Sequence, residues 1–296
     1  MDPLILLHGF DFHGVIFHSL ERRLSANFQV IVVDLPGFGK SLPLSVPYTF
    51  DNIIGFIFER CPAPAIWVGW SFGGLVALWA ALHYPELVKK VVTLATSLKF
   101  IETSGWPGIS EREFEKFSGD LHNDYSVTLQ RFLSLQCFQS QNGKSIFKTL
   151  KRDSALYSSP YPAALLGTLK LLKESDFRSQ LSEIGCPVLQ IYGEKDTLVP
   201  FAATEVLLTK VPKTMPVEFN VIVGASHIPF LSHEDQVVTL LQDFLLAETM
   251  QFCSSSFYCE SESFPQADHV IPAQAGIQKR GLILDASLRW HDKLAI

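Results

Sequence analysis

A serine stands in the middle of the stretch Gly69–Gly73, which reads Gly-Trp-Ser-Phe-Gly. The apolar run 65–68 comes before it, and the helix-compatible run 75–82 comes after it. A serine at a sharp turn from strand to helix is lifted above the end of the sheet, and the helix N-terminus points at it. The pattern therefore predicts that Ser71 is a nucleophile, although a glycine-rich turn without a catalytic role also fits it.

A serine nucleophile needs a general base, and that base needs an acid to orient it. Asp196 and His227 each follow an apolar run and are the candidates. Asp196 alone fits a turn residue, and His227 alone fits a buried structural histidine. In the chain order Ser71, Asp196, His227, however, they predict a Ser-His-Asp triad. His233 is a rival base, ranked lower because it is expected to begin the closing helix.

The negative charge that develops on a reacting carbonyl oxygen needs two aimed N–H donors. We expect one from the backbone of Phe72, the residue after the nucleophile. The second is expected from Phe10, in the His-Gly-Phe stretch that ends the first strand. His8 is predicted to hold this loop by hydrogen bonds beneath the site rather than to act as a second base.

Short apolar runs alternate with helix-compatible runs, and these elements must position the candidates. Strands are predicted at 4–7, 28–34, 66–69, 91–95, 187–193 and 217–223. Helices are predicted near 16–26, 50–59, 75–83, 202–210 and 236–246. The alternation indicates an α/β fold with a mostly parallel, doubly wound sheet. The loops at the carboxyl ends of such strands collect the site, which is where the candidate acid and base lie.

The alternation stops between residues 97 and 176. Helices are predicted there at 111–117, 127–135, 144–152 and 163–173. We interpret 97–176 as a helical cap inserted into a core made of 1–96 and 177–248. Residues 249–296 contain Ser-rich, low-complexity stretches and show no clear period, so we predict a mobile extension with no assigned function.

The composition narrows the functional class. A chain of 296 residues with 47% hydrophobic and 18% charged residues is typical of a globular protein with a sizeable core. A net charge of -6 does not indicate nucleic-acid binding. The five cysteines form no Cys-x-x-Cys pair, which favours reduced thiols. The start does not resemble a signal peptide, and no run approaches a membrane span. We expect a cytoplasmic monomer with no membrane partner.

No pattern in the sequence indicates a metal or a cofactor. Gly39-Lys40-Ser41 is similar to the end of a phosphate-binding loop, but Asp34 occupies the place of its first glycine. His8, His13 and His18 recur every five residues, a spacing that places no two of them on one helix face. We therefore expect neither a metal site nor a cofactor site.

The predicted cap carries a local excess of positive charge. Its basic residues are Arg131, Lys144, Lys148, Lys151 and Arg152. A solvated helix face explains these residues, and so does a docking patch for an acidic partner.

The serine turn at 69–73, the cap and the two loops that carry Asp196 and His227 resemble those of the α/β-hydrolases. The more specific resemblance is to the pimeloyl-[acyl-carrier protein] methyl ester carboxylesterases of biotin synthesis (BioH type). The matching stretches are 6–9, 34–41, 69–74, 131–136 and 225–233. The resemblance covers about residues 4–246, and the cap stretch Arg-Phe-Leu-Ser-Leu-Gln at 131–136 is the discriminating one.

The resemblance implies roles for individual residues. Ser71, Asp196 and His227 match the triad of the family, and Phe10 stands where the family often has tryptophan beside the oxyanion hole. The cap segment that lines the acyl channel is matched by Phe132, Leu133, Ser134, Leu135 and Gln136. The basic cap positions that contact the carrier protein are matched by Arg131, Lys144 and Lys148, whereas Val127 occupies a fourth such position without a charge.

The resemblance thus implies a serine carboxylesterase that hydrolyses the methyl ester of a pimeloyl group held on acyl-carrier protein. One alternative is a general short-chain carboxylesterase or lactonase with the same triad. Another, from a different class, is a non-catalytic ligand receptor on the hydrolase fold, against which the complete triad argues.

Overall fold

The structure is a computed structural model that describes residues 1–140, 142–154, 157, 159–210 and 217–247. The predicted extension 249–296 lies outside the described residues. Within them, all the predicted strands and helices are present, most of them within a few residues of the expected bounds.

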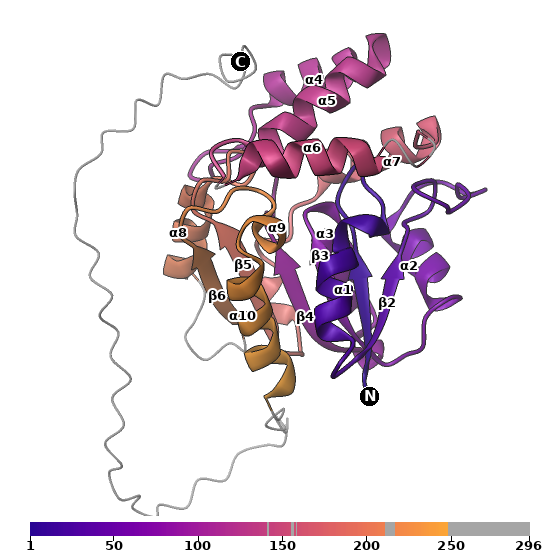
Figure 1. Cartoon of the computed structure of the whole chain (residues 1–296), viewed down its shortest axis with the longest axis vertical. Helices are drawn as coiled ribbons and strands as arrows, with labels where there is room; N and C mark the ends of the chain where they lie inside the picture. The colour runs from indigo at the N-terminus through magenta and orange to yellow at the C-terminus, as the bar shows by residue number, and fades with distance from the viewer. Residues whose placement is uncertain (141, 155–156, 158, 211–216, 248–296) are drawn as a thin grey trace, which may run out of the picture. The chain divides into compact units, whose positions relative to one another are not determined.

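One six-stranded sheet runs through the centre of the described chain (Figure 1). Its strands are β1 (Pro3–Leu7), β2 (Gln29–Val33), β3 (Ala65–Trp70), β4 (Val88–Leu94), β5 (Val188–Gly193) and β6 (Val217–Ile222). They lie in the order β2-β1-β3-β4-β5-β6, and every pairing is parallel. β3 and β5 are buried along their whole length, as expected of central strands with helices on both faces. The prediction of a mostly parallel sheet is confirmed.

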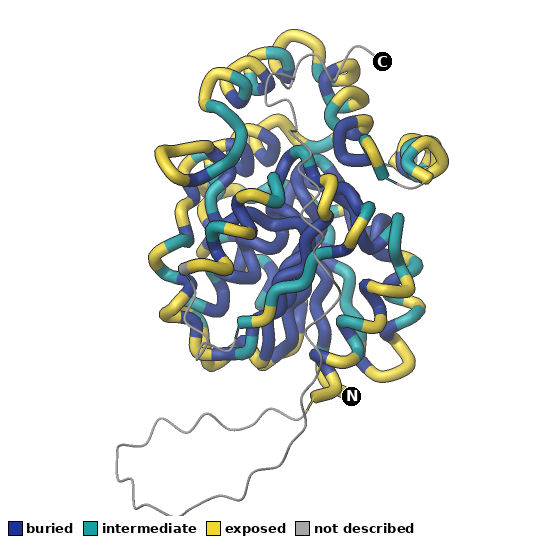
Figure 2. The backbone as a smooth tube through the Cα atoms, turned by 90° about the vertical axis from the view of Figure 1, so that its left-hand side faces the viewer, coloured by how far each residue is buried: buried dark blue, intermediate teal, exposed yellow. Residues whose placement is uncertain are grey.

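Helices cover the sheet and leave its strands buried inside (Figure 2). Outside the 97–176 segment they are η1 (Gly14–Phe17), α1 (His18–Leu24), α2 (Phe50–Phe58), α3 (Phe72–His83), η2 (Pro85–Leu87), η3 (Leu181–Glu183), α8 (Phe201–Lys210), α9 (Pro229–Ser232) and α10 (Glu234–Leu246). α1 and α10 lie side by side in front of the sheet in Figure 1 and are joined by an ion pair between Arg23 and Asp235. α2 packs on α3 through stacked rings of Phe50 and Trp79. No helix of the described ranges is long and apolar enough to cross a membrane.

Four helices lie between β4 and β5 in the sequence and above the carboxyl ends of the strands in Figure 1. They are α4 (Glu111–Asn123), α5 (Tyr125–Cys137), α6 (Gly143–Ser154) and α7 (Pro162–Glu174). α4 begins with a capping box in which Ser110 and Glu113 exchange hydrogen bonds. Asp124 caps the start of α5 by accepting a hydrogen bond from the Val127 N–H.

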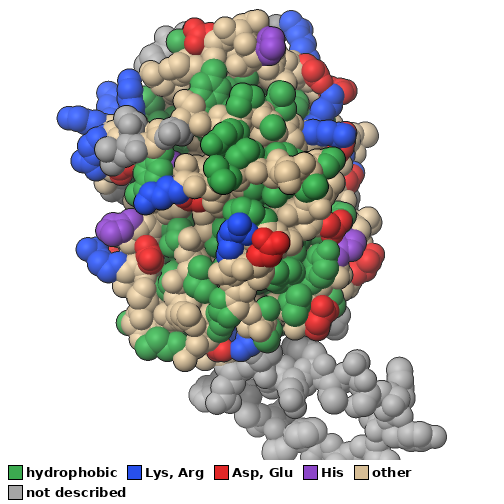
Figure 3. Space-filling view, turned by 90° about the vertical axis from the view of Figure 1, so that its right-hand side faces the viewer, with side chains coloured by type: hydrophobic (Ala, Val, Ile, Leu, Met, Phe, Trp, Pro, Cys, Tyr) green, Lys and Arg blue, Asp and Glu red, His purple; other side chains and the backbone are tan. Residues whose placement is uncertain are grey.

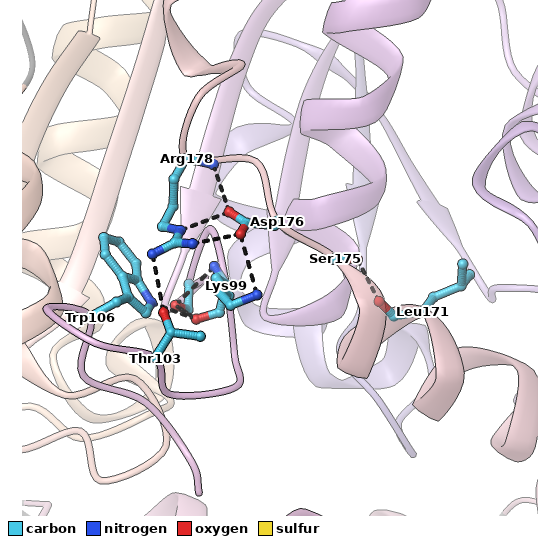
Figure 4. Close-up of polar contacts among 8 residues, drawn as sticks. Lys99, Thr103, Trp106, Leu171, Ser175, Asp176 and Arg178 are labelled. Atoms are coloured by element: carbon cyan, nitrogen blue, oxygen red, sulfur yellow. Dashed lines mark hydrogen bonds and ion pairs between the residues drawn. The ribbon is translucent and has the colours of Figure 1, made fainter. Parts of the chain in front are cut away.

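A polar cluster joins the two chain segments that lead into α4 and out of α7 (Figure 4). The Asp176 carboxylate accepts hydrogen bonds from Arg178 Nε at 2.7 Å and from Arg178 Nη2 at 2.6 Å. Lys99 Nζ lies 3.2 Å from the same carboxylate. Because Lys99 follows β4 and Asp176 precedes β5, the cluster links the chain before α4 to the chain after α7.

Replacing Asp176 with asparagine is expected to destabilise the fold in a pH-dependent way. Arg178 is the main cause that lowers the pKa of Asp176 to about 2, from 3.8. A lowered carboxyl pKa stabilises the fold above the unfolded value of 3.8, and this stabilisation is lost as the pH falls toward about 2. The side chain is 36% exposed, so water screens the pair and we expect a loss of about 1 kcal/mol at neutral pH.

Denaturant unfolding of Asp176→Asn, measured between neutral pH and about pH 2, tests this expectation. The difference from the unmodified chain should shrink at the acid end. Asp243→Asn is a matched control, because Asp243 is exposed on α10 and forms no ion pair within the described residues. A loss that is independent of pH, or equal in the two variants, would contradict a role for the Asp176 charge.

Candidate active site

Ser71 lies at the junction between β3 and α3, in a backbone conformation that L-residues rarely adopt. Its φ is 53° and its ψ is -114°. Its N–H donates to the Leu94 carbonyl at 2.9 Å, and its carbonyl accepts from Thr96 Oγ1 at 3.1 Å. A non-glycine residue with this φ is strained, and such strain persists only where the surroundings hold it in place. Contacts from the end of β4 and the residues after it therefore hold the turn that presents the serine.

The two glycines of the motif are required by close backbone approach. A Cβ atom at Gly69 would overlap the backbone of Gly73. A Cβ atom at Gly73 would overlap the carbonyl of Leu7, on the neighbouring strand β1. A larger residue at either position would push the first turn of α3 away from the sheet, and the serine would move with it.

The structure brings Ser71, His227 and Asp196 together in one hydrogen-bonded chain. His227 Nε2 lies 3.1 Å from Ser71 Oγ, and His227 Nδ1 lies 2.7 Å from Asp196 Oδ2. All three are buried, with exposed fractions of 7% for Ser71, 5% for Asp196 and 1% for His227. With the proton on Nδ1, the imidazole donates to the carboxylate and accepts from the serine hydroxyl. This arrangement can remove a proton from Ser71.

The acid and the base are held by the loops that carry them. Asp196 Oδ1 accepts from the N–H groups of Leu198 and Val199, at 2.8 and 2.9 Å. Trp70 Nε1 donates to the His227 carbonyl at 2.9 Å. These bonds leave Asp196 Oδ2 free to face the imidazole.

Two further contacts were not foreseen from the sequence. Glu194 Oε2 accepts from the Gly224 N–H at 2.8 Å, which links the acid loop to the base loop. Ser226 Oγ donates to the Gln136 carbonyl at 2.7 Å, which links the base loop to α5. Both join residues that are distant in the sequence, and no motif marks them.

The remaining histidines near the site have other roles. His233 Nδ1 lies 2.9 Å from the Ser232 hydroxyl, and His233 is the N-cap of α10, as predicted. His8 Nδ1 donates to the Gly9 carbonyl at 2.8 Å, and His8 Nε2 accepts from the Leu35 N–H at 2.9 Å. Burial lowers the pKa of His8 to about 4, so the ring is neutral at neutral pH. The predicted structural role of His8 is confirmed.

The backbone N–H groups of Phe10 and Phe72 have no hydrogen-bond acceptor within the described residues. Phe72 is the first residue of α3, where such N–H groups have no acceptor within the helix. Both side chains are buried. The Phe10 ring packs edge-to-face on Phe132 of α5, with ring centroids 5.9 Å apart, and Phe132 also packs on Phe117 of α4 at 5.1 Å.

The other predicted acyl-channel residues of α5 differ in burial. Leu133, Leu135 and Gln136 are buried, whereas Ser134 is exposed. Leu133 also lines a cavity next to the loop that follows β1. One face of α5 therefore packs inward, and Ser134 lies on its solvent side.

The predicted docking residues are exposed on adjacent helices. Arg131 lies on α5, and Lys144 and Lys148 lie on α6. None of the three forms an ion pair within the part of the chain that the structure describes. Val127, at the fourth docking position implied by the resemblance, lies on the same helix as Arg131; its side chain is uncharged and 41% exposed. On the face that Figure 3 shows, Lys and Arg side chains gather near the upper margins, and hydrophobic side chains occupy much of the centre.

Among the described residues, no three His, Cys, Asp or Glu side chains are arranged to hold a metal ion. The described cysteines, Cys61, Cys137 and Cys186, are free and buried.

Comparison with known proteins identifies the family. The profile of the alpha/beta hydrolase fold family matches residues 2–234. A pimeloyl-[acyl-carrier protein] methyl ester esterase from Aliivibrio salmonicida is 36% identical over 245 residues, which cover 83% of this chain and 92% of that protein. The protein of the same name from Xanthomonas campestris pv. campestris is 38% identical, covering 82% and 95%.

Among solved structures, an esterase from Exiguobacterium antarcticum superposes with a TM-score of 0.73. It is 22% identical, and the match covers 83% of this chain and 92% of that one. This likeness concerns the fold, whereas the sequence relatives define a narrower group. The chain belongs to the α/β-hydrolase fold family and, within it, to the group of the pimeloyl-[acyl-carrier protein] methyl ester esterases.

Proposed function

We propose that this protein is a serine carboxylesterase that hydrolyses the methyl ester of a pimeloyl group held on acyl-carrier protein, a step of biotin synthesis. The hydrogen-bonded chain from Ser71 through His227 to Asp196 carries the proposal. The names of the sequence relatives support the choice of substrate. We also propose that the enzyme is cytoplasmic and that it works as a monomer, since a single chain supplies the whole triad and needs no residue from a second copy.

In the first half of the reaction, Ser71 Oγ attacks the ester carbonyl carbon and His227 Nε2 takes the hydroxyl proton. The carbonyl oxygen becomes an oxyanion, which the N–H groups of Phe10 and Phe72 stabilise. Asp196 stabilises the imidazolium that forms and keeps its ring in place. The intermediate collapses and the carbon–oxygen bond to the methoxy group breaks. His227 gives its proton to the departing methoxy oxygen, which leaves as methanol.

In the second half, water attacks the acyl-enzyme. His227 takes a proton from the water, and the same N–H groups stabilise the second oxyanion. Collapse of this intermediate breaks the bond to Ser71 Oγ, which regains its proton from His227. The products are the free carboxylic acid on the carrier and one methanol, and no redox step or cofactor is needed.

The core, residues 1–96 and 177–248, supplies the triad in this proposal, and the cap, 97–176, supplies the acyl site. The Phe132 ring packs on Phe10, the proposed oxyanion donor, so the acyl chain would run along α5. Phe132, Leu133, Leu135 and Gln136 would form the wall of its channel, with Ser134 at the solvent end. The exposed cations Arg131, Lys144 and Lys148 would meet the acidic carrier protein.

Reversing two of these charges is expected to weaken catalysis on the carrier-bound ester only. In Lys144→Glu with Lys148→Glu, attraction to an acidic carrier becomes repulsion, so kcat/KM on that substrate should fall about tenfold or more at low salt. The kcat/KM for p-nitrophenyl butyrate, which has no carrier, should not change. Initial rates on both substrates, with and without added salt, measure this.

The matched control is Arg22→Glu with Lys170→Glu, which changes the net charge equally but at exposed positions on α1 and α7. This control should leave both substrates unaffected. A general short-chain carboxylesterase or lactonase, the alternative function, would be indifferent to both pairs of substitutions. Equal loss in the two double variants would contradict docking at α5 and α6.

A further inference from the structure

The turn after β1 presents Phe10, whose backbone N–H is one of the two proposed oxyanion donors. The Phe12 N–H donates to the Gly9 carbonyl at 3.3 Å and closes this turn over Gly9–Phe12. The Phe10 N–H has no acceptor within the described residues, so it is free to donate to a substrate. An oxyanion donor acts at about 2.7–3.1 Å from the charged oxygen, and a displacement of about 1 Å can cost about 100-fold in rate. The turn must therefore be held closely in place.

Asp11, the third residue of this turn, has a backbone conformation that glycine adopts most easily. Its φ is 60°. An L-residue is strained there because its Cβ atom lies close to its own backbone, although aspartate and asparagine tolerate the region better than most. Such strain persists where the surroundings hold the residue in place. A side chain at this position therefore needs a contact that offsets the strain.

The Asp11 side chain makes that contact with α5. Its Oδ1 accepts from the Tyr125 hydroxyl at 3.1 Å, across 114 positions in the sequence. Tyr125 is the first residue of α5, and Asp124 caps this helix end. Phe132, farther along the same helix, packs on the ring of Phe10. One helix thus holds two adjacent residues of the turn, Phe10 by an apolar contact and Asp11 by a hydrogen bond.

The surroundings of this hydrogen bond strengthen it. Asp11 and Tyr125 are both partly buried. Burial is the main cause that raises the pKa of Asp11 well above its ordinary 3.8, and it also raises the pKa of Tyr125 above 10.0. Tyr125 therefore stays protonated, and its hydroxyl remains available as a donor. A hydrogen bond is stronger in such a place than in water, and a polar group that loses its partner there is destabilised.

We propose that Asp11 is a positioning residue of the oxyanion hole. Its hydrogen bond to Tyr125 fixes the Gly9–Phe12 turn against α5 and thereby holds the Phe10 N–H where the oxyanion forms. Asp11 acts through Phe10 and takes no proton in the reaction. This role rests on the proposed function, because the oxyanion forms when Ser71 attacks an ester.

Two variants of the full chain remove the hydrogen bond, one from each side. Tyr125→Phe removes the donor and leaves the residues of the turn unchanged. Asp11→Gly removes the acceptor, and glycine adopts a φ of 60° without strain. Each should lower kcat for p-nitrophenyl butyrate about tenfold and change KM by less than about twofold, because the oxyanion forms only after the substrate has bound. Initial rates measure this, and denaturant unfolding detects a purely structural role, which would lower stability without this split between kcat and KM.

Asp11→Asn is the conservative variant. Its amide oxygen can accept from Tyr125, and asparagine tolerates a positive φ, so kcat should stay within about threefold of that of the unmodified chain. Tyr161→Phe is the matched control, because Tyr161 is exposed at the N-cap of α7, and it should change neither constant. The role of Asp11 would be overturned if Tyr125→Phe left kcat unchanged, or if Asp11→Asn or Tyr161→Phe lowered it as much as Asp11→Gly.

The double variant Asp11→Gly with Tyr125→Phe tests whether the two residues act as a unit. Since each single variant already breaks the same hydrogen bond, the double variant should lose no more than the larger of the two single losses. A further fall of about tenfold would show that the residues act separately and would contradict the proposed role.

Amide hydrogen exchange, followed by NMR, decides the same question without turnover. In Tyr125→Phe, but not in Tyr161→Phe, the Phe12 N–H should exchange about tenfold faster, because the turn that it closes is no longer held. An unchanged exchange rate would overturn the role of Asp11. If the unmodified chain hydrolyses no ester, the proposed function fails, and the exchange rates alone judge whether Asp11 holds the turn. If it hydrolyses p-nitrophenyl butyrate but not the carrier-bound ester, only the proposed substrate fails, and the kinetic test stands.

Discussion

Ser71→Ala is expected to lower the turnover of p-nitrophenyl butyrate by about 10⁴-fold to 10⁶-fold, the range typical of a lost serine nucleophile. The substitution removes the Oγ atom that lies 3.1 Å from His227 Nε2 and that forms the acyl-enzyme in the proposed reaction. Alanine keeps the Cβ atom, so the backbone at φ 53° is no more strained than before. The fold should therefore persist.

Circular dichroism and thermal unfolding check that the variant is folded, and initial rates check its turnover. Ser182→Ala is the matched control, because Ser182 is exposed in η3 and is not part of the triad. It should behave like the unmodified chain. A folded Ser71→Ala protein that keeps more than about a hundredth of the turnover would refute the nucleophile assignment.

Asp196→Asn should lower kcat by about 10⁴-fold with little change in structure, as expected when a triad acid loses its charge. Asp196 Oδ2 accepts the proton of His227 Nδ1 at 2.7 Å. An amide in its place can present its NH₂ group instead, which favours the tautomer with the proton on Nε2. That tautomer cannot accept the Ser71 proton.

The Leu198 and Val199 N–H groups can still donate to the amide oxygen, so the loop should keep its shape. The kcat for p-nitrophenyl butyrate is the measurement, with unfolding in denaturant as the check on the fold. Glu183→Gln, at an exposed carboxylate of η3, controls for a change of one charge elsewhere. A fall of less than about tenfold would show that another group orients the imidazole.

The sheet and its helices were predictable because the patterns that specify them are local. β3 is an unbroken apolar run, β5 is apolar except for Gln190, and both strands are buried throughout. The turn at Ser71 was predictable for the same reason, since its serine and its two glycines lie within five consecutive residues. Asp196 and His227 were found because each follows a strand directly, where an α/β sheet collects its site.

The start of β4 shows where a local pattern misleads. The strand was predicted at 91–95, after Lys89 and Lys90, yet it begins at Val88 and contains both lysines. Lys90 is buried, and its Nζ donates to the carbonyls of Phe244, Leu245 and Ala247. These carbonyls lie at the C-terminus of α10, where a helix leaves its last carbonyls without partners of its own. They stabilise the charge of the buried Lys90 side chain. Residues more than 150 positions away thus decide whether it can occupy a strand.

The contacts that position the site were not predictable for the same reason. Trp70 donates to a carbonyl 157 residues away, and Ser226 donates to one 90 residues away. Each side chain has many conceivable partners, and only the packed fold selects one. His13 is a further example: in the sequence it was one of three evenly spaced histidines, and in the structure it is buried with its ring stacked on Tyr157, far along the chain.

In the proposed reaction, Ser71 attacks the methyl ester of a carrier-bound pimeloyl group, and the ester is hydrolysed. Intact-mass spectrometry of acyl-carrier protein loaded with that ester, incubated with the purified chain, tests it directly. We predict that the carrier loses the mass of one methylene group while one methanol appears per carrier, and that Ser71→Ala leaves the ester intact. The proposed function would be contradicted if the unmodified enzyme left the ester on the carrier intact, or if Ser71→Ala hydrolysed it equally fast.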